Sequence, residues 1–394
     1  MDQPPPRVRH VIGCMTGTSL DGLDAALTRI TGTGLDMTAE FVGMVSAPLP
    51  DALRTTLLSM ANGEPYPPIE YMRAARYLGV VHAEACAELI STHGQAAENS
   101  GGGGIDFVVA HGQTIWHAPA DRLSWQLFDP WPIVRTLNLP VCYDLRQADL
   151  VADGEGAPIT PIADWVMYRK YGLGVVVLNL GGIANVTKLT GDVMDTEGRD
   201  VYPCNLLIDG VVQQLFPGKK FDNDGQVSAQ GISSDYVHNL LMKHPKIIAA
   251  DEGFENWSLG REDVGPEWIK KIVDQAPQGL RAADIVASTV DAVGRWLGLE
   301  MDSAHLNILA GGGTKNPILV DKLKASASSR SRPKPVKTVL SDELGIPCEA
   351  REAMGFAVLG ALSADGVPIT LPRVTGSEKP GVTGVWAYPE GPPC

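Results

Sequence analysis

The sequence predicts an α/β protein of two domains. Its 394 residues are more than one hydrophobic core usually holds, and 44% of them are apolar, which is enough for a sizeable core. Segments with the periodicity of strands alternate with segments of helical periodicity. A unit made of a strand, a glycine-rich turn and a returning strand begins at Val8 and again at Val175, near the start of each half. If each domain placed its glycine-rich hairpin at one shared cleft, the repeat of this unit in the two halves would be explained.

The first of these units has a turn of small and hydroxyl-bearing residues. Strands are expected over residues 8–14 and 23–30, and Asp21-Gly22 between them is a hairpin signal. Asp21 and Asp24 could bind Mg²⁺ or its water ligands. An ordinary hairpin with a polar turn explains the same residues equally well. The groups that would suit phosphate oxygens are the backbone at Gly13 and Gly17 and the hydroxyls of Thr16, Thr18 and Ser19.

Charge and cysteine content exclude several classes of partner. The net charge of −14 and the pI near 5.0 argue against nucleic acid and against an anionic membrane surface. No apolar run is long enough to span a membrane, and the N-terminal residues lack the apolar stretch of a signal peptide. The six cysteines are scattered without metal-like spacing. We therefore expect a reduced cytoplasmic protein without a membrane partner.

Apolar periodicity and breaker residues place the remaining elements of the first half. Apolar residues recur at steps of three and four through residues 69–93, which predicts the clearest helix of the chain. Three prolines between residues 65 and 68 separate it from the preceding helix. Strands are expected over 41–48, 105–110 and 141–145, helices over 51–62 and 158–171, and the end of a further helix over 134–139. We place the domain boundary near residue 150.

The second half opens with the second hairpin. A strand over 175–180 runs into Gly181-Gly182, and a strand over 186–190 returns. A strand over 306–310 meets three glycines directly before a helix, an arrangement that brings backbone N–H groups against a ligand at a helix N-terminus. The tail after residue 372, rich in Gly and Pro, is expected to be irregular. Further helices are expected over 205–216, 282–299, 318–326 and 349–364, and a further strand over 335–340.

Several common nucleotide and hydrolase sites are excluded by their missing motifs. The sequence has no Walker A loop, no GxGxxG fingerprint between a strand and a helix, no kinase HRD and DFG set and no GxSxG elbow. His111 and His117 lack partners at metal-ligand spacing. What remains is a split glycine-rich site, and phosphoryl transfer at such a site also needs a carboxylate near the acceptor. The candidates are Asp144, Asp149, Asp195 and Asp209.

Eight ordered motifs resemble one known family. Residues 13–24 are similar to its GxMSGTSxDGxD motif, 110–115 to SHGQTI, 144–149 to DFRxxD and 154–158 to the end of GGQGAP. Residues 179–186 are similar to NIGGIANV, 260–262 to the end of TGRE, 311–313 to GGG and 352–357 to EAMAFA. On these motifs the chain resembles the anhydro-N-acetylmuramic acid kinases, sugar kinases of the superfamily that includes hexokinase, actin and the heat-shock ATPases.

This resemblance implies a fold and two ligands. The fold would be α/β, with two RNase-H-like domains of the actin and hexokinase type and a cleft for ATP and sugar between them. The first domain would comprise residues 1–150 plus about 350–394, and the second 151–349. Small-molecule anhydrosugar, ATP and Mg²⁺ are the implied ligands, Asp21 is the candidate metal ligand, and a homodimer is suggested.

The resemblance also assigns the two binding sides. ATP and its phosphates would be bound by Gly13, Thr16, Gly17, Thr18, Ser19, Asp21, Gly22, Asn179, Gly181, Gly182, Asn185, Gly311, Gly312, Gly313 and Asn316. The sugar would be bound by His111, Gln113, Arg146, Asp149, Arg261 and Glu262.

The implied reaction has two parts. Water attacks the anomeric carbon and opens the 1,6-anhydro bridge, and the freed O6 takes the γ-phosphoryl group. The base that activates this water in the family is the aspartate of a DTGPGN motif, and Asp195-Thr196 matches its start. A carboxylate that is ionised at working pH can accept this proton without special tuning.

The chain departs from the family pattern directly after Asp195. Residues 195–205 read DTEGRDVYPCN, which places extra residues at 197–202 in a loop expected to be tight. This insertion could be a specialisation, a loss of activity or an error in the gene model. The alternatives are therefore a kinase for another anhydrosugar, resembling levoglucosan kinase, and a catalytically impaired protein that binds nucleotide or sugar. An actin-like or heat-shock-type ATPase fits the fold but not the sugar-side motifs.

Overall fold

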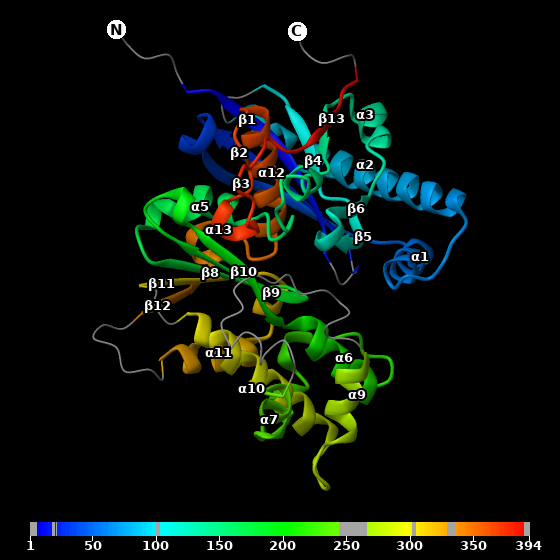
Figure 1. The fold of residues 1–394 in the computed structure, drawn as a ribbon, viewed down its shortest axis with the longest axis vertical. Coiled ribbons are helices and arrows are strands. Elements are labelled where there is room, and N and C mark those ends of the chain that lie inside the picture. Colours follow the sequence, from blue (N-terminus) through cyan, green and yellow to red (C-terminus); the bar gives the residue numbers. More distant parts are fainter. Residues whose placement is uncertain are drawn as a thin grey trace. The chain divides into compact units, whose positions relative to one another are not determined.

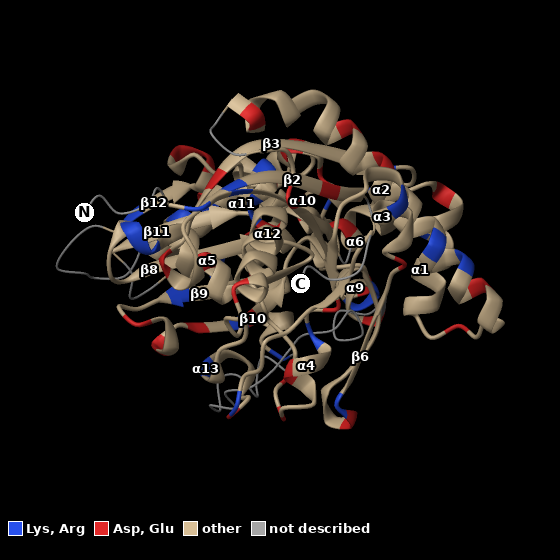
Figure 2. Cartoon of the chain, turned by 90° about the horizontal axis from the view of Figure 1, so that it is seen from above, with Lys and Arg blue, Asp and Glu red and all other residues tan. Residues whose placement is uncertain are grey.

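The computed structural model divides the chain into two compact units (Figure 1). It describes residues 6–17, 20, 22–99, 103–243, 266–301, 305–328 and 336–389. The first unit comprises residues 1–171, 191–197 and 344–394, and the second comprises residues 172–190 and 198–343. Acidic and basic residues are interspersed along the helices and strands of the chain (Figure 2). Within the described ranges, no helix is both long and apolar enough to cross a membrane.

The first unit is built on a six-stranded mixed sheet. Its strand order is β13-β7-β4-β1-β2-β3, in which β1, β2 and β3 form an antiparallel meander and β4 runs parallel to β1 and β7. The strands are β1 (Val8–Thr16), β2 (Gly22–Thr31), β3 (Thr38–Pro48), β4 (Phe107–Ala110), β7 (Val141–Tyr143) and β13 (Val385–Ala387). A separate hairpin is formed by β5 (Gln113–Ala118) and β6 (Leu123–Leu127).

Helices cover both faces of this sheet. Ile12 and Cys14 of β1 belong to the core that includes the buried side of the long helix α2, whereas Gly13 between them meets α12. This alternation follows from the two-residue period of a strand. The helices of the first unit are α1 (Asp51–Ala61), α2 (Pro68–Asn99), α3 (Trp131–Leu137), α4 (Gln147–Leu150), α5 (Pro161–Tyr168), α12 (Ala350–Ala364) and α13 (Pro372–Thr375).

Helix α12 is fixed at both ends by buried ion pairs. At its start, Arg351 Nε donates to Asp164 Oδ1 of α5 at 2.8 Å, and both side chains are buried. Directly after its end, Asp365 accepts from both terminal nitrogens of Arg9 on β1 at 2.8 Å. Breaking such a pair leaves an uncompensated buried charge. Both pairs therefore fix α12 against the first unit.

The second unit repeats the topology of the first. Its sheet has the order β10-β9-β8-β11-β12, with β8 and β9 antiparallel and β11 parallel to both β8 and β12. This is the same order as β3-β2-β1-β4-β7, so the prediction of two RNase-H-like domains is confirmed. The strands are β8 (Val175–Leu180), β9 (Ile183–Leu189), β10 (Glu197–Pro203), β11 (Leu306–Ala310) and β12 (Lys337–Leu340).

Two glycines let the longest described helix of the second unit pack closely on its neighbour. A methyl group at Gly294 would meet the Lys322 side chain at 2.7 Å, and one at Gly298 would overlap Ser326. The hydroxyl of Ser326 donates to Arg295 O at 2.9 Å across this contact. The described helices of this unit are α6 (Asn205–Leu215), α7 (Tyr236–Leu241), α9 (Pro266–Asp274), α10 (Ala282–Glu300) and α11 (Pro317–Ser328).

Four features differ from the sequence-based expectations. The units separate after Tyr171 rather than near residue 150, because α5 is joined to α12 by the Asp164–Arg351 pair. Residues 197–202, expected to be an insertion in a tight loop, form most of β10 (Glu197–Pro203) and continue the sheet. The tail expected to be irregular forms α13 and β13. The β5–β6 hairpin was not expected, since its tryptophans and polar residues gave no clear strand period.

The close contact between β1 and α12 gives a stability prediction. A methyl group at Gly13 would overlap the backbone carbonyl of Ala353, which cannot move without shifting α12. Gly13→Ala should lower the free energy of unfolding by about 1–3 kcal/mol, the usual cost of overpacking, as measured by urea denaturation. Gly381→Ala, at a glycine where no atom of the described part of the chain lies within 4 Å of the added carbon, is the matched control and should stay at wild-type stability. Equal stabilities of the two variants would contradict this packing argument.

Candidate functional site

In the first unit, the predicted sugar-side residues His111 and Arg146 contact each other directly. Arg146 Nε and Nη2 lie 3.1 Å and 3.0 Å from His111 Nε2, and Arg146 Nη1 donates to Gly156 O at 2.7 Å. His111 Nδ1 lies 2.9 Å from Gly112 O, a group that can only accept. The imidazole must therefore carry its proton on Nδ1 and accept from Arg146 with Nε2. These contacts fix the plane of the guanidinium.

The charge state of His111 follows from this arrangement. Burial, with a smaller contribution from the positive charge of Arg146, lowers the pKa of His111 to about 3. The imidazole is thus neutral at physiological pH and can serve as an acceptor for the guanidinium. It is poorly suited to exchange protons with a substrate near pH 7. Its chemical role is to orient Arg146.

Gln113 follows His111 closely in the chain, and Thr16 is brought to the same place by the fold. Thr16 Oγ1 donates to Gly112 O at 2.9 Å, which joins the end of β1 to the start of β5. Gln113 is 4% exposed, and its Nε2 donates to Thr114 O at 3.3 Å. Its Oε1 is buried and has no hydrogen-bond partner among the described residues. Such an unmatched acceptor usually marks a ligand or water position.

Asp149, also predicted on the sugar side, has its carboxylate occupied by protein donors. Oδ2 accepts from Gly156 N at 2.8 Å, and Oδ1 accepts from Thr375 Oγ1 at 2.9 Å. The side chain is fully buried. Asp149 therefore supports the loop that carries Gly156, the residue whose carbonyl accepts from Arg146.

Glu352 is a further ionisable group near this cluster, and it was absent from the predicted site residues. It lies in the first turn of α12, next to Arg351. Burial raises the pKa of Glu352, Arg351 opposes this shift, and weaker electrostatic effects come from Asp24 and Arg146. A carboxyl group with a raised pKa among charged neighbours is typical of functional sites. The family-like motif at residues 352–357, which begins with Glu352, could have identified this residue from the sequence.

Asp195, predicted as the catalytic base, lies at the end of a short 3₁₀ helix (Val193–Asp195) in the first unit. Its side chain is 53% exposed, and Oδ1 lies 3.0 Å from Arg373 Nη2. Asp200 follows on β10 and is half-buried in the second unit. The two carboxylates thus belong to different units of the chain.

In the second unit, the turn between β8 and β9 packs against the start of α6. Asn205 N donates to Gly181 O at 3.1 Å, and Asn205 Nδ2 donates to Leu180 O at 3.1 Å. Cys204 N donates to Gly182 O at 2.9 Å. The sheet register sets Asn179 opposite Asn185. Asn205 fixes this turn, although it was not among the predicted site residues.

The three consecutive glycines after β11 lie on the same turn but differ in their surroundings. A methyl group at Gly311 would overlap Asn179 Oδ1, and one at Gly313 would meet Leu180 O at 2.9 Å. Gly311 also has a φ of +86°, which disfavours other residues. Gly312 is exposed, and no atom of the described residues lies within 4 Å of such a methyl group. Gly311 and Gly313 are therefore explained by packing, and Gly312 offers backbone to a ligand.

Asn179 and Asn316 show which amide side chains of this cluster remain available. Asn179 is buried, and its Oδ1 has no hydrogen-bond partner within the described ranges. Asn316 Oδ1 accepts from the backbone of Ile318 and Leu319 at 3.1 Å and 3.2 Å, so it caps α11. Its Nδ2 donates to Asp222 Oδ2 at 3.2 Å. Asn179 thus has an open acceptor, whereas Asn316 is used to build the joint.

Five of the predicted site residues lie outside the described residues. They are Thr18, Ser19, Asp21, Arg261 and Glu262. In the parts of the chain that are described, no group of three or more His, Cys, Asp or Glu side chains could bind a metal ion. The assignment of Mg²⁺ to Asp21 therefore stays a prediction.

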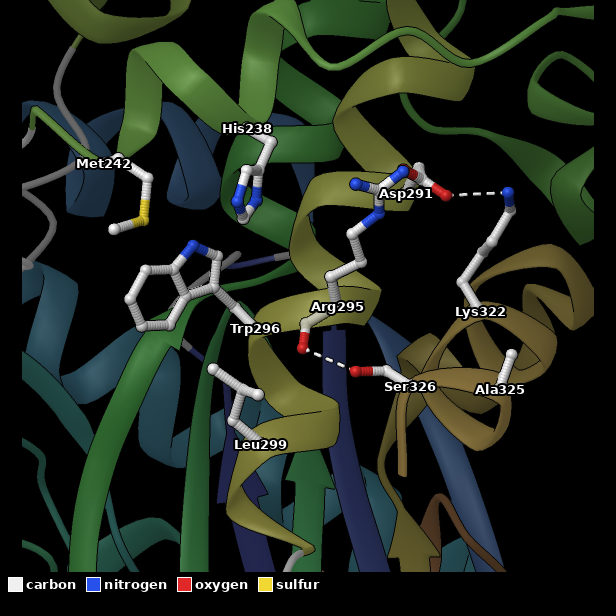
Figure 3. Close-up of a pocket in the computed structure, with 9 residues that line it drawn as sticks. All are labelled: His238, Met242, Asp291, Arg295, Trp296, Leu299, Lys322, Ala325 and Ser326. Carbon is white, nitrogen blue, oxygen red and sulfur yellow. Dashed lines mark hydrogen bonds and ion pairs between the residues drawn. The ribbon is translucent and has the colours of Figure 1, made fainter. Parts of the chain in front are cut away.

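A cavity of about 650 Å³ in the second unit lies on helices α7, α10 and α11 (Figure 3). Asp291 pairs there with Arg295 at 2.7 Å and with Lys322 at 2.6 Å. None of the predicted site residues that the structure describes lines it. The lining residues are His238, Met242, Asp291, Arg295, Trp296, Leu299, Lys322, Ala325 and Ser326.

Comparison with known proteins gives matches along nearly the whole chain. A family model for anhydro-N-acetylmuramic acid kinases matches residues 9–389. The anhydro-N-acetylmuramic acid kinase of Prochlorococcus marinus (strain MIT 9313) is 31% identical over 406 residues, covering 96% of this chain and 100% of that protein. The protein of that name from Bordetella avium (strain 197N) is 33% identical over 385 residues, covering 97% and 96%.

Likeness to solved structures is weaker. The activator of the 2-hydroxyisocaproyl-CoA dehydratase from Clostridium difficile with bound ADPNP is 10% identical and has a TM-score of 0.44. The match covers 90% of this chain and 95% of that chain.

The depressed pKa of His111 predicts a pH dependence of stability. Below about pH 6.5 the imidazole protonates in the unfolded chain but stays neutral in the folded one, so the unfolded state binds more protons. Between about pH 6.5 and its folded pKa near 3, His111 should lower stability by about 1.4 kcal/mol for each unit of falling pH. Urea denaturation of His111→Gln at pH 7 and pH 5 should show a smaller loss than wild type. A His111→Gln variant that loses as much stability between pH 7 and pH 5 as wild type would contradict a neutral buried His111.

Proposed function

Because the chain belongs to the family of anhydro-N-acetylmuramic acid kinases, we propose that it phosphorylates 1,6-anhydro-N-acetylmuramic acid with ATP. The observation that carries this proposal is the family match over residues 9–389. In the proposed reaction, water adds to the anomeric carbon, the bond from that carbon to the bridging oxygen breaks, and the freed O6 becomes the phosphoryl acceptor. Since ATP is the phosphoryl donor, we place the activity in the cytoplasm.

The cluster of the second unit is suited to hold the phosphates and nucleoside of ATP. Gly312 offers open backbone, Asn179 has an unmatched buried acceptor, and Asn205 fixes the turn of Gly181 and Gly182. Backbone N–H groups bind phosphate oxygens without bringing extra charge into the site. Bound MgATP would supply the phosphoryl group, and Asp21 is the proposed contact to Mg²⁺.

The cluster of the first unit is suited to hold an acidic sugar. Arg146 presents a guanidinium whose plane is fixed by His111 and Gly156. A planar guanidinium in a fixed orientation recognises a carboxylate, such as the lactyl group of the muramic acid. The buried Oε1 of Gln113 can accept from a sugar hydroxyl. Levoglucosan lacks the acidic group, so this cluster favours the muramic sugar over the plain anhydrosugar.

Two carboxylates compete for the role of the base that accepts a proton from water. Asp195 is the residue that the sequence predicts. Asp200 is a candidate because of its place on β10. This strand is continuous from Glu197 to Pro203 and leads to α6 at Asn205. Read along this strand, residues 200–205 (DVYPCN) match the length of the family's DTGPGN motif without a gap. Removal of a general base typically costs roughly 10²–10⁴-fold in rate.

ADP release with MgATP tests the function and the base together. Wild-type protein should release ADP with 1,6-anhydro-N-acetylmuramic acid and much less with levoglucosan. Of Asp195→Asn and Asp200→Asn, the variant lacking the base should lose roughly 10²-fold or more in kcat, and the other should stay active. Asp192→Asn, at an exposed neighbour whose side chain accepts from Met194 N at the start of the 3₁₀ helix, is the control. ATP binding without sugar-dependent ADP in folded wild-type protein would refute the kinase and favour a binding protein.

We propose that the protein forms a homodimer through an aromatic face of the first unit. Trp116 and Trp125 lie opposite each other on β5 and β6 and are 58% and 46% exposed. Tyr71 of α2 extends this face, with its ring centroid 5.1 Å from that of Trp125. Contiguous exposed aromatic residues are typical of protein interfaces.

The mass of the protein in solution tests this face. Wild type should elute as a dimer in size-exclusion chromatography with light scattering, and Trp116→Ser combined with Trp125→Ser should shift it toward the monomer. Leu173→Ser, which removes an exposed apolar side chain elsewhere, should leave the dimer intact. A monomeric wild type, or a dimer that survives the double substitution, would refute the proposal.

A further inference from the structure

The C-terminal residues 371–377, here called the C-terminal clasp, contact two predicted site residues of the first unit. Thr375 Oγ1 donates to Asp149 Oδ1 at 2.9 Å, and Thr375 O accepts from Glu155 N at 2.7 Å. Arg373 pairs with Asp195 at 3.0 Å. The clasp therefore joins the loop after α4 and the segment that carries Asp195, although these lie far apart in the sequence.

Thr375 reaches Arg146 through two further contacts. Asp149 uses one carboxylate oxygen for Thr375 and the other for Gly156 N, at 2.8 Å. Gly156 O in turn accepts from Arg146 Nη1 at 2.7 Å. Each group in this series holds the next one by a hydrogen bond. Displacement of Asp149 would therefore move the acceptor that sets the direction of the guanidinium.

The contacts of the clasp differ in burial, and burial determines how strongly each one holds the segment that it contacts. Thr375 and Asp149 are both buried, so loss of the hydroxyl would leave a carboxylate oxygen without its donor in the interior. Arg373 and Asp195 are both more than half exposed, where ion pairs contribute little. Ser377 Oγ donates to Ala152 O at 3.0 Å in a partly buried contact. Thr375 is therefore the residue of the clasp with the strongest hold on the loop.

We propose that Thr375 is a positioning residue for sugar binding, which acts through Asp149 and Gly156 on the orientation of Arg146. The proposal rests on the proposed function, because it assigns Arg146 to the acidic group of the sugar. It gives the C-terminal clasp a role in substrate affinity. Thr375 itself touches no substrate in this scheme.

Three variants of buried threonines separate positioning from stability. Thr375→Val keeps the shape but removes the hydroxyl, and Thr375→Ser restores it. Thr370→Val is the matched control, since Thr370 is buried in the same region and its Oγ1 has no hydrogen-bond partner among the described residues. Steady-state kinetics with ATP and with 1,6-anhydro-N-acetylmuramic acid give the two KM values, and amide hydrogen exchange reports on Gly156.

The expected result is a selective change. Thr375→Val should raise the KM for the sugar roughly tenfold and leave the KM for ATP within about twofold, because misorientation of one binding group weakens only its own ligand. Thr375→Ser should return to within about threefold of wild type, Thr370→Val should match wild type, and Gly156 should exchange faster only in Thr375→Val.

Two different failures can be told apart. A wild-type protein that does not turn over the sugar refutes the proposed function. A wild-type protein that is active, with a folded Thr375→Val whose KM for the sugar is unchanged or rises only together with that for ATP, refutes the positioning role and leaves the function standing.

Discussion

The buried carboxylate of Asp149 is the interaction on which the sugar side of the first unit depends. A carboxylate without solvent must find donors within the protein, and Asp149 finds them in Gly156 N and Thr375 Oγ1. Its two oxygens tie a loop next to α4 to a residue near the C-terminus. Arg146 then takes its direction from Gly156 O and from the neutral imidazole of His111. Among the predicted sugar-binding groups, Asp149 and His111 are thus buried supports, and they orient Arg146, the group proposed to contact the sugar.

Helix α12 imposes a second constraint on the same unit. It approaches β1 so closely at Gly13 that a methyl group would overlap backbone, and the buried Asp164–Arg351 pair fixes its first turn. Glu352 lies in that turn, so the position of its carboxyl group is set by the packing that stabilises the unit. Gly13 was predicted to approach phosphate, yet its surroundings explain it by contact with α12. Stability and site geometry therefore depend on the same contacts here.

The second unit separates the two reasons for which a glycine is used. Gly311 and Gly313 are required because Asn179 and Leu180 leave no room for a side chain, whereas no described residue fills the space beside Gly312. Asn316 was predicted as a ligand-binding residue together with these glycines. Its side chain instead caps α11 and donates to Asp222. A motif can thus mark a site while only some of its members are free to contact a ligand.

The sequence by itself determined the order of the elements, the two strand–glycine-turn–strand units and the family, because periodicity and short motifs are local properties. Only the tertiary structure decided that 197–203 is an edge strand, that 151–171 belongs to the first unit, and that the tail expected to be irregular clasps the loop of Asp149. Thr375 and Asp149 are 226 residues apart, and no local pattern encodes such a pairing. The physical reason is that a buried carboxylate takes its donors from whatever the fold brings near it.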